Sequence, residues 1–461
     1  MSKEKPSIPK GTRDFGPLEV SRRESIFSVI RKVFRLHGYM PIETPAMEHL
    51  STLMGKYGEE GDRLIFKILN SGDFPAAVHE ADWSSRDPQR LSSRICEKAL
   101  RYDLTVPFAR YVVQHQNELT FPFKRFQIQA VWRADRPQKG RYREFYQCDA
   151  DVIGSDSLVN EAELIQIIDE VFSILGIEVV IKMNNRKILA GLADHIGFPE
   201  LLTDITTAID KIEKIGLAHV RAELFSKGLT EGAIARLDPI LTMHGTNKEK
   251  LDLLDSILSA NPDGRNGISE IRELFELVDI SPVSCQLDLD LTLARGLNYY
   301  TGAIIEVKAK DMAFGSICGG GRYDDLTGIF GLAGVSGVGI SFGVDRIYDV
   351  LHELSGFPES TASFSSVMAV NLGKKEMAYC LPVLKLLREA GIGCEMYPEP
   401  VKMKKQMQYA NRNKIAFVLI AGESEMERGL FTLRDMQTGK QTEAGKEEVV
   451  QIIRSHQLQP W

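Results

Sequence analysis

Two segments of alternating polar and apolar residues constrain this 461-residue chain more than any other feature. Within residues 126–133, apolar residues alternate with a second series that includes Gln127 and Gln129, so the two series lie on opposite faces of a predicted strand. A charged, turn-rich segment follows at 134–140, and residues 141–153 return with the same period of two. We therefore predict an antiparallel hairpin whose polar groups are concentrated on one face.

The polar face of this hairpin has the residue types that bind phosphate. Its returning segment carries Arg141, Arg143, Gln147, Asp149 and Asp151. An arginine at the mouth of a hairpin, such as Arg133, can reach a phosphate through its planar fork. Asp135, in the connecting turn, could share a triphosphate with Mg²⁺. Alternation alone still favours a simpler interpretation, in which the hairpin is charged and solvated.

Three glycine-containing segments are further candidates for a site. The segment RGLNYYTG at 295–302 could form a narrow polar pocket, or it could be a turn that packs its tyrosine rings in the core. Gly319–Gly321 permit close approach of the backbone to a ligand, or they form a flexible turn. Residues 336–342 are predicted to be a strand of small residues that leads into a helix, with Arg346 in its first turn able to hold a terminal phosphate.

Composition and charge narrow the class of protein. No stretch approaches 18 consecutive apolar residues and no secretory signal begins the chain, so we expect a cytoplasmic protein with no membrane span. The six cysteines include no CxxC pair, which favours reduced thiols over a zinc site. The net charge of −7 argues against indiscriminate coating of nucleic acid, but residues 366–461 carry 14 Lys and Arg against 11 Asp and Glu. A local basic face therefore remains compatible with the composition.

The order of helical and strand-like segments predicts a catalytic domain that is interrupted once. We expect its two parts at 1–185 and 281–355, separated by a helical insertion at 186–280. A linker rich in Ser, Gly, Pro and Thr is expected at 356–365. Alternating strands and helices then predict a compact α/β domain at 366–461. The fold class is thus α/β, or more strictly α+β.

Six segments together resemble the histidyl-tRNA synthetases, a family of class II aminoacyl-tRNA synthetases. Residues 37–50, with their proline at 45, are similar to class II motif 1, residues 126–151 to motif 2 and residues 337–347 to motif 3. Three segments are similar to sequences specific to the histidine enzymes: LRYDLTVPFAR at 100–110, RGLNYYTG at 295–302 and GGGRYDDL at 319–326. The class II motifs alone would leave many amino acids open, so these three segments carry the assignment to histidine.

The resemblance implies an ATP site. Arg133 would bind the α-phosphate and Arg295 would face it from the other side, so these two are the expected catalytic residues. Arg141 and Arg346 would hold the γ-phosphate of a bent ATP. Mg²⁺ is expected to bind through the ATP phosphates, with Asp135 as a possible protein contact. Asp135 stands where glutamate is usual in bacterial members, so its reach is shorter by one methylene.

The resemblance also implies a histidine site. The residues expected there are Asp103, Thr105 and Gln147 at the α-amino group, Asp151, Tyr299 and Tyr300 at the imidazole ring, and Arg295 beside them. Asp151 also stands where glutamate is usual. Buried groups that bond both ring nitrogens can reject analogues by roughly 10⁴–10⁵ without editing.

The implied activity is the charging of tRNA(His) with L-histidine at the expense of ATP. The implied fold is a class II catalytic domain built on an antiparallel sheet, with a helical insertion and a C-terminal anticodon-binding domain, in a homodimer. One alternative is a non-catalytic regulatory paralogue that binds histidine, which the arginines at 133, 295 and 346 and the C-terminal unit disfavour. A nucleic-acid-binding module without chemistry is a second alternative, which the acidic balance of residues 1–365 disfavours.

Overall fold

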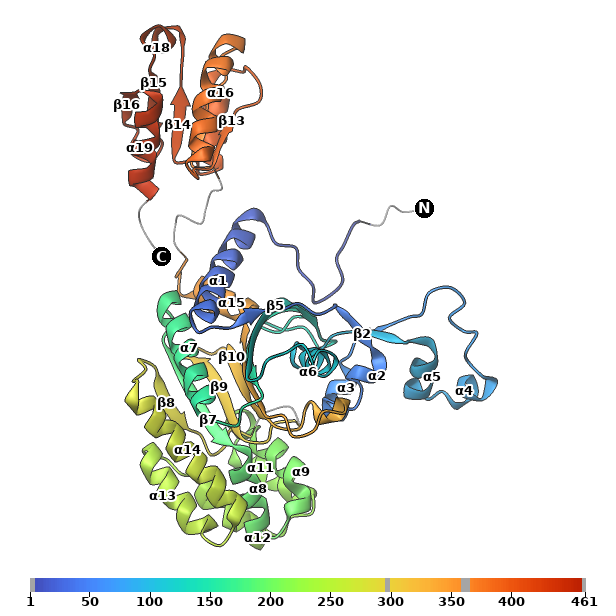
Figure 1. The fold of residues 1–461 in the computed structure, drawn as a ribbon. Helices are drawn as coiled ribbons and strands as arrows, with labels where there is room; N and C mark the ends of the chain where they lie inside the picture. Colours follow the sequence, from blue (N-terminus) through green and yellow to red (C-terminus); the bar gives the residue numbers. More distant parts are fainter. Residues whose placement is uncertain (1–4, 295–298, 358–364, 458–461) are drawn as a thin grey trace. The chain divides into compact units, whose positions relative to one another are not determined.

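The computed structural model describes residues 5–294, 299–357 and 365–457 (Figure 1). It contains two compact units, one of residues 1–14 and 26–356 and the other of residues 15–25 and 357–461. Helix α1 (Pro17–Leu36) begins in the second of these units and continues into the first. Within the described residues, the first unit contains two sheets and the second unit contains one, and both units combine strands with helices.

In the described part of the first unit, the largest sheet has eight strands. Their order is β1 (Met40–Pro41), β5 (Phe123–Trp132), β6 (Glu144–Ile153), β11 (Gly337–Gly343), β10 (Cys318–Tyr323), β9 (Ala303–Ala309), β7 (Val179–Asn185) and β8 (Gln286–Leu289). Neighbours run antiparallel except at the edges, where β1 pairs with β5 and β8 with β7 in parallel. The predicted hairpin is confirmed, because β5 and β6 are antiparallel with Gln129 opposite Gln147.

The two faces of this sheet differ as the alternation predicts. On one face, Phe34 of α1 contacts Phe126 and Phe342 at ring-centroid distances of 5.6 and 5.9 Å. Phe172 of α7 (Val159–Leu175) contacts Phe342 at 5.6 Å. The core therefore lies between the sheet and helices α1 and α7, and the polar residues of the hairpin lie on the opposite face.

A smaller three-stranded sheet forms between residues 47 and 100. Its order is β2 (Met47–His49), β4 (Lys98–Leu100) and β3 (Lys67–Ile68). The helices around it are α2 (Leu50–Leu53), α3 (Gly58–Arg63), α4 (Glu80–Ser85), α5 (Pro88–Ile95) and α6 (Thr105–Gln114). Figure 1 shows α4 and α5 lying away from the large sheet. Tyr57 and Tyr102 share an apolar cluster with Tyr323 of β10, which joins the small sheet to the large one.

Residues 186–280 form the helices expected from their composition. They are α8 (Arg186–His195), η1 (Pro199–Leu201), α9 (Leu202–Ile209), α10 (Ile212–Ile215), α11 (Leu217–Ser226), α12 (Glu231–Leu241), α13 (Asn247–Leu258) and α14 (Pro262–Ile280). Thr246 and Glu249 form a reciprocal capping box at the start of α13. Glu213 of α10 pairs with Lys182 of β7 at 2.6 Å and with Lys308 of β9 at 2.5 Å, so ion pairs attach these helices to the large sheet.

The second unit has a five-stranded mixed sheet. Its order is β13 (Cys394–Met396), β12 (Val367–Ala369), β14 (Phe417–Ile420), β15 (Phe431–Asp435) and β16 (Gln441–Ala444), the first three being parallel. Its helices are α16 (Lys374–Glu389), α17 (Met403–Arg412), α18 (Glu423–Arg428) and α19 (Lys446–Gln457). The alternating strands and helices agree with the α/β prediction for this region, although α18 and β16 were not predicted.

One prediction is corrected by the fold. The interpretation of Gly319–Gly321 as a flexible turn is wrong, because all three glycines lie within strand β10. A Cβ at Gly320 would overlap the carbonyl oxygen of Gly339 on β11, and a Cβ at Gly321 would stand 2.5 Å from the carbonyl oxygen of Ala303 on β9. The glycines are therefore required by close packing of three strands rather than by a turn.

Candidate active site

A cavity of about 660 Å³ lies in the first unit, lined in part by strands β6, β9, β10 and β11. The predicted site residues that line it are Arg133, Asp135, Arg141, Gln147, Tyr300 and Arg346. The other described ones, Asp103, Thr105, Asp151 and Tyr299, do not line it. Arg295, predicted for both the ATP and the histidine site, lies outside the described residues.

Glycines allow this cavity to reach the backbone of the sheet. Gly319, Gly320 and Gly343 line it together with the small residue Ser341. Gly339, which is also on β11, has no room for a side chain, because a Cβ there would overlap the Asp151 carboxylate. Larger residues at these positions would fill the side of the cavity that the sheet forms, or they would displace neighbouring strands. With glycine and serine there, a flat group can lie against the backbone.

Arg133, at the end of β5, is held in a fixed direction. Its Nε donates to the carbonyl oxygen of Tyr102 at 3.1 Å. Its guanidinium lies 4.3 Å from the ring centroid of Tyr102 and 5.2 Å from that of Phe145. These contacts engage one N–H group and place the cation against two aromatic rings, which restricts its orientation at the cavity wall.

Arg346 and Arg141 supply two further positive charges. Arg346 is in the first turn of α15 (Val344–Glu353), as predicted, and its Nε donates to the carbonyl oxygen of Gly140 at 2.8 Å. Its Nη1 donates to the carbonyl oxygen of Ser316 at 2.5 Å. Arg141 Nη1 lies 3.7 Å from Asp135 Oδ1, and the Arg141 side chain is 44% exposed. Arg141 can therefore reorient toward a ligand at little cost, whereas Arg346 is already fixed.

Asp345, next to Arg346, is an anchor that the sequence analysis missed. Its carboxylate pairs with Arg13 and accepts a hydrogen bond from the backbone N–H of Tyr146 at 3.0 Å. The Arg13 guanidinium also stacks 3.3 Å from the ring centroid of Tyr142. These contacts fasten the N-terminal segment and the first turn of α15 to the hairpin that carries Arg141.

Asp103 lies behind the cavity in a set of tyrosine hydroxyls. Tyr57 Oη donates to its Oδ1 at 2.9 Å, the N–H of Val106 donates to the same oxygen at 3.2 Å, and Tyr299 Oη lies 3.5 Å from Oδ2. Burial raises the pKa of Asp103, while the bond from Val106 and the nearby Arg133 oppose the rise. Tyr57 was not predicted, although it lines the cavity, because no local pattern distinguishes its position.

Asp151 is buried and has two strong partners. Arg125 Nη2 lies 2.8 Å from its Oδ2, with both side chains at most 3% exposed, and Tyr323 Oη donates to its Oδ1 at 2.6 Å. The Arg125 guanidinium lies 4.2 Å from the ring centroid of Phe108. Both partners were missed. The alternation that predicts this strand would have found Arg125 if it had been extended one residue toward the N-terminus, because Arg125 continues the series of Gln127 and Gln129.

The side-chain amide nitrogen of Gln147 is engaged in a hydrogen bond, whereas its amide oxygen is available to a ligand. Its Nε2 donates to Ser341 Oγ at 2.7 Å. Its Oε1 is buried and has no hydrogen-bond partner among the described residues. Asp149 pairs in register with Ser341 and is 2% exposed. Burial raises the pKa of Asp149, Arg125 opposes the rise and Asp151 adds to it.

No described helix is long and apolar enough to cross a membrane. No group of three or more His, Cys, Asp or Glu side chains in the described ranges is arranged to hold a metal ion.

A cavity walled by arginines over a glycine-rich antiparallel sheet is the arrangement of a class II aminoacyl-tRNA synthetase. The crystal structure of histidyl-tRNA synthetase from Nostoc sp. PCC 7120 superimposes with a TM-score of 0.83 at 31% sequence identity, covering 98% of this chain and 100% of that one. The described elements therefore share the class II fold along nearly the full chain.

Family models and curated relatives then give the family. Residues 11–74 and 97–347 match the histidyl-tRNA synthetase model, and residues 366–456 match the anticodon binding domain model. The histidine–tRNA ligase of Phocaeicola vulgatus is 57% identical over 451 residues, which is 98% of this chain and 99% of the relative. That of Porphyromonas gingivalis is 58% identical over 438 residues, 95% of this chain and 96% of the relative. The chain belongs to the histidyl-tRNA synthetase family.

Proposed function

We propose how the described residues carry out the reaction of this family, the ATP-dependent ligation of histidine to its tRNA. The chain has this activity by its family membership, and ATP is its substrate. In the first step the histidine carboxylate attacks the α-phosphorus of ATP, the bond to the bridging oxygen breaks, and pyrophosphate leaves. In the second step the terminal ribose hydroxyl of the tRNA attacks the carbonyl carbon of histidyl-adenylate, and AMP leaves.

The first step requires positioning and neutralisation of charge rather than a protein nucleophile. A carboxylate is already nucleophilic at neutral pH, so the main barrier is the repulsion between two anions. We assign the α-phosphate to Arg133, whose plane is fixed by Tyr102 and Phe145. We assign the γ-phosphate to Arg346 and Arg141, and the opposite side of the α-phosphate to Arg295, as the resemblance implies.

Mg²⁺ fits the polyphosphate end of this cavity. Asp135 lines the cavity next to Arg141 and is the carboxylate that would contact the ion. When bound, the ion offsets the negative charge of the ATP phosphates. Arg141 competes for the same carboxylate at 3.7 Å, so we expect it to turn from Asp135 toward the γ-phosphate when ATP binds.

Histidine is assigned to the part of the cavity lined by Gln147 and Tyr300. The unpaired Oε1 of Gln147 can accept a hydrogen bond from the α-ammonium group, which Asp103 and Thr105 would complete. Burial raises the pKa of Tyr300, so its hydroxyl stays protonated and can donate to an imidazole nitrogen. By the resemblance, Asp151 would accept from the other nitrogen, with Tyr299 nearby. Neither residue lines the cavity here, so this contact requires Asp151 to share its Oδ1 with Tyr323 or its Oδ2 with Arg125.

One observation carries this assignment. A single cavity is lined both by three arginines, which suit the phosphates of ATP, and by the uncharged polar side chains of Gln147, Ser341 and Tyr300, which suit hydrogen bonds to histidine. The pairing of Asp151 with Arg125 supports a neutral imidazole as the ligand, because that carboxylate is already compensated.

The proposal also covers the domain boundaries, the oligomeric state and the cellular compartment. We assign the catalytic domain to 1–185 and 281–355, the helical insertion to 186–280, the linker to 356–365 and the anticodon-binding domain to 366–461. By resemblance at motif 1 the active form is a homodimer. The cysteines form no CxxC pair and favour reduced thiols, which fits a cytoplasmic enzyme.

Histidine-dependent ATP–pyrophosphate exchange tests the arginine assignments. Arg133→Ala and Arg346→Ala should each lower the exchange rate by about 10²–10³, the usual effect of removing one preorganised donor from a charged transition state. Arg412→Ala, at the end of α17 in the second unit, is the matched control and should exchange at the wild-type rate. Near-wild-type exchange by Arg133→Ala would remove that residue from the phosphate site.

A further inference from the structure

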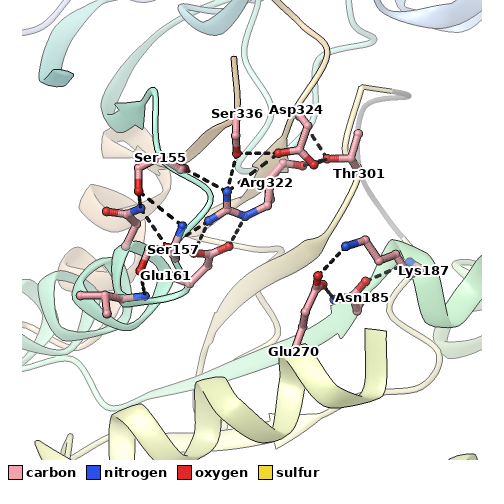
Figure 2. A network of polar contacts seen from close by, with 12 residues as sticks. Ser155, Ser157, Glu161, Asn185, Lys187, Glu270, Thr301, Arg322, Asp324 and Ser336 are labelled. Atoms are coloured by element: carbon pink, nitrogen blue, oxygen red, sulfur yellow. Dashed lines mark hydrogen bonds and ion pairs between the residues drawn. The ribbon is translucent and has the colours of Figure 1, made fainter. Parts of the chain in front are cut away.

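A set of polar contacts includes the residue that follows Tyr300 in the chain, and it has no role in the chemistry above (Figure 2). We call it the Arg322 network, and it consists of Glu161, Thr301, Arg322, Asp324 and Ser336. Its members come from α7, from the segment that follows Tyr300, from β10 and its end, and from the residue before β11. These elements are far apart in the sequence, so the network joins four separate parts of the first unit.

The centre of the Arg322 network is a fully buried ion pair. Arg322 Nε donates to Glu161 Oε1 at 2.5 Å and its Nη2 donates to Oε2 at 2.6 Å, with side chains that are 5% and 0% exposed. The remaining Nη1 donates to Ser336 Oγ at 2.5 Å. Such a fork has one geometry only, so the position of Arg322 on β10 is tied to α7.

The Arg322 network then reaches the residue next to Tyr300. Thr301 Oγ1 donates to Asp324 Oδ2 at 2.5 Å, and the N–H of Asp324 donates back to Thr301 Oγ1 at 3.1 Å. The N–H of Thr301 donates to the carbonyl oxygen of Arg322 at 2.8 Å. Ser336 Oγ holds the other oxygen of Asp324 at 2.6 Å. Figure 2 shows Asp324 lying between Thr301 and Ser336.

The backbone on the far side of Thr301 is fixed as well. The carbonyl oxygen of Gly302 accepts a hydrogen bond from the N–H of Arg186, the first residue of α8, at 2.8 Å. A Cβ at Gly302 would stand 3.2 Å from Arg322 Cδ, so the chain passes close to the arginine here. Thr301 thus has contacts on its side chain and on its N–H, and the backbone is held again one residue later at Gly302. The residue before Thr301 is the tyrosine that lines the cavity.

We infer that Thr301 and Asp324 are positioning residues that set the place of the Tyr300 hydroxyl for histidine recognition, with the Arg322–Glu161 pair as their fixed support. The inference rests on the proposed role of Tyr300 in reading the imidazole ring. Neither residue lines the cavity, so any effect on binding passes through neighbouring residues, and Tyr300 is the adjacent one that lines it. Because Tyr300 is assigned to the imidazole ring, we expect the effect to be selective for histidine over ATP.

The test compares KM for histidine with KM for ATP in pyrophosphate exchange. Thr301→Val keeps the shape of the side chain and removes its hydroxyl, and we expect KM for histidine to rise by about 10- to 100-fold, the range for losing a hydrogen bond to a charged group, with KM for ATP unchanged. Thr301→Ser restores the hydroxyl and should return KM for histidine toward the wild-type value.

A matched control and a double variant complete the test. Thr432→Val, in the second unit, removes a hydrogen bond of the same kind, from Thr432 Oγ1 to Glu425 Oε1 at 3.0 Å, and should change neither KM. Tyr300→Phe should raise KM for histidine, and adding Thr301→Val to it should raise KM little further, because the hydroxyl to be positioned is already absent.

The outcomes separate this inference from the function on which it rests. If Tyr300→Phe leaves KM for histidine unchanged, the proposed role of Tyr300 fails, and the inference fails with it. If Tyr300→Phe raises that KM but Thr301→Val does not, only the inference is overturned. Additive effects of the two changes, or an equal rise in both KM values for Thr301→Val, would also overturn it.

Discussion

Asp149 provides the sharpest test of the electrostatics at the polar face. It is 2% exposed, it lies between Gln147 and Asp151 on the same face of β6, and burial raises its pKa. The change Asp149→Asn keeps the shape of the side chain and removes the ionisation. We predict that it stabilises the first unit at neutral pH, because the folded chain no longer has to hold a carboxylate in a desolvated position.

The direction in which the free energy of unfolding changes with pH follows from proton linkage. The unfolded chain releases the Asp149 proton near the ordinary pKa of about 3.9, whereas the folded chain keeps it to higher pH. The free energy of unfolding of the wild-type chain should therefore fall as pH rises between these two pKa values, by up to about 1.4 kcal/mol per pH unit from this group. Asp149→Asn lacks this contribution, so its advantage over the wild-type chain should grow with pH across that window.

Urea unfolding at several pH values measures this difference, with Trp83 and Trp132 of the first unit as fluorescent reporters. Asp169→Asn is the contrasting control, because hydrogen bonds from Ser284 overcome burial and lower the pKa of Asp169. Its contribution is fully present above the unfolded pKa, so the loss in Asp169→Asn should be constant from pH 5 to 8. A constant difference for Asp149→Asn over the same range would refute the reasoning.

Two further predictions concern the buried ion pair and the second unit. Arg125→Met should lower the free energy of unfolding by about 3–5 kcal/mol, because it leaves the Asp151 carboxylate buried without its partner, and urea unfolding measures this. Restoring most of that loss with Asp151→Asn in the same chain would support the account, and no loss in Arg125→Met would contradict it. Deleting residues 366–461 should weaken tRNA aminoacylation more than pyrophosphate exchange, and an equal loss in both assays would count against an anticodon-binding role.

The hairpin and its polar face could be predicted from the sequence because the side chains of a strand alternate with a period of two. Arg133, Arg141 and Gln147 line the cavity for that reason. Strand β11 and the position of Arg346 could be predicted equally well, because a strand of small residues leads directly into the first turn of a helix.

The partners of the buried carboxylates could not be predicted in the same way. Tyr57 reaches Asp103 from a loop before α3, and Tyr323 reaches Asp151 from β10, which is 172 residues away in the chain. No local pattern encodes such contacts, because they depend on strand order in the sheet. The glycines of β10 were ambiguous for a related reason. A run of glycine is compatible with a turn, and only the neighbouring strands, at Gly339 of β11 and Ala303 of β9, show that a side chain has no room.

Pyrophosphate exchange by the purified full-length chain, measured with each of the common amino acids, tests the central claim most directly. The cavity joins three arginines to buried groups that can hydrogen-bond an imidazole ring, so the account predicts exchange that depends on histidine and is lower by roughly 10⁴ or more with other amino acids. Exchange that does not depend on histidine, or that is equally fast with another amino acid, would contradict it.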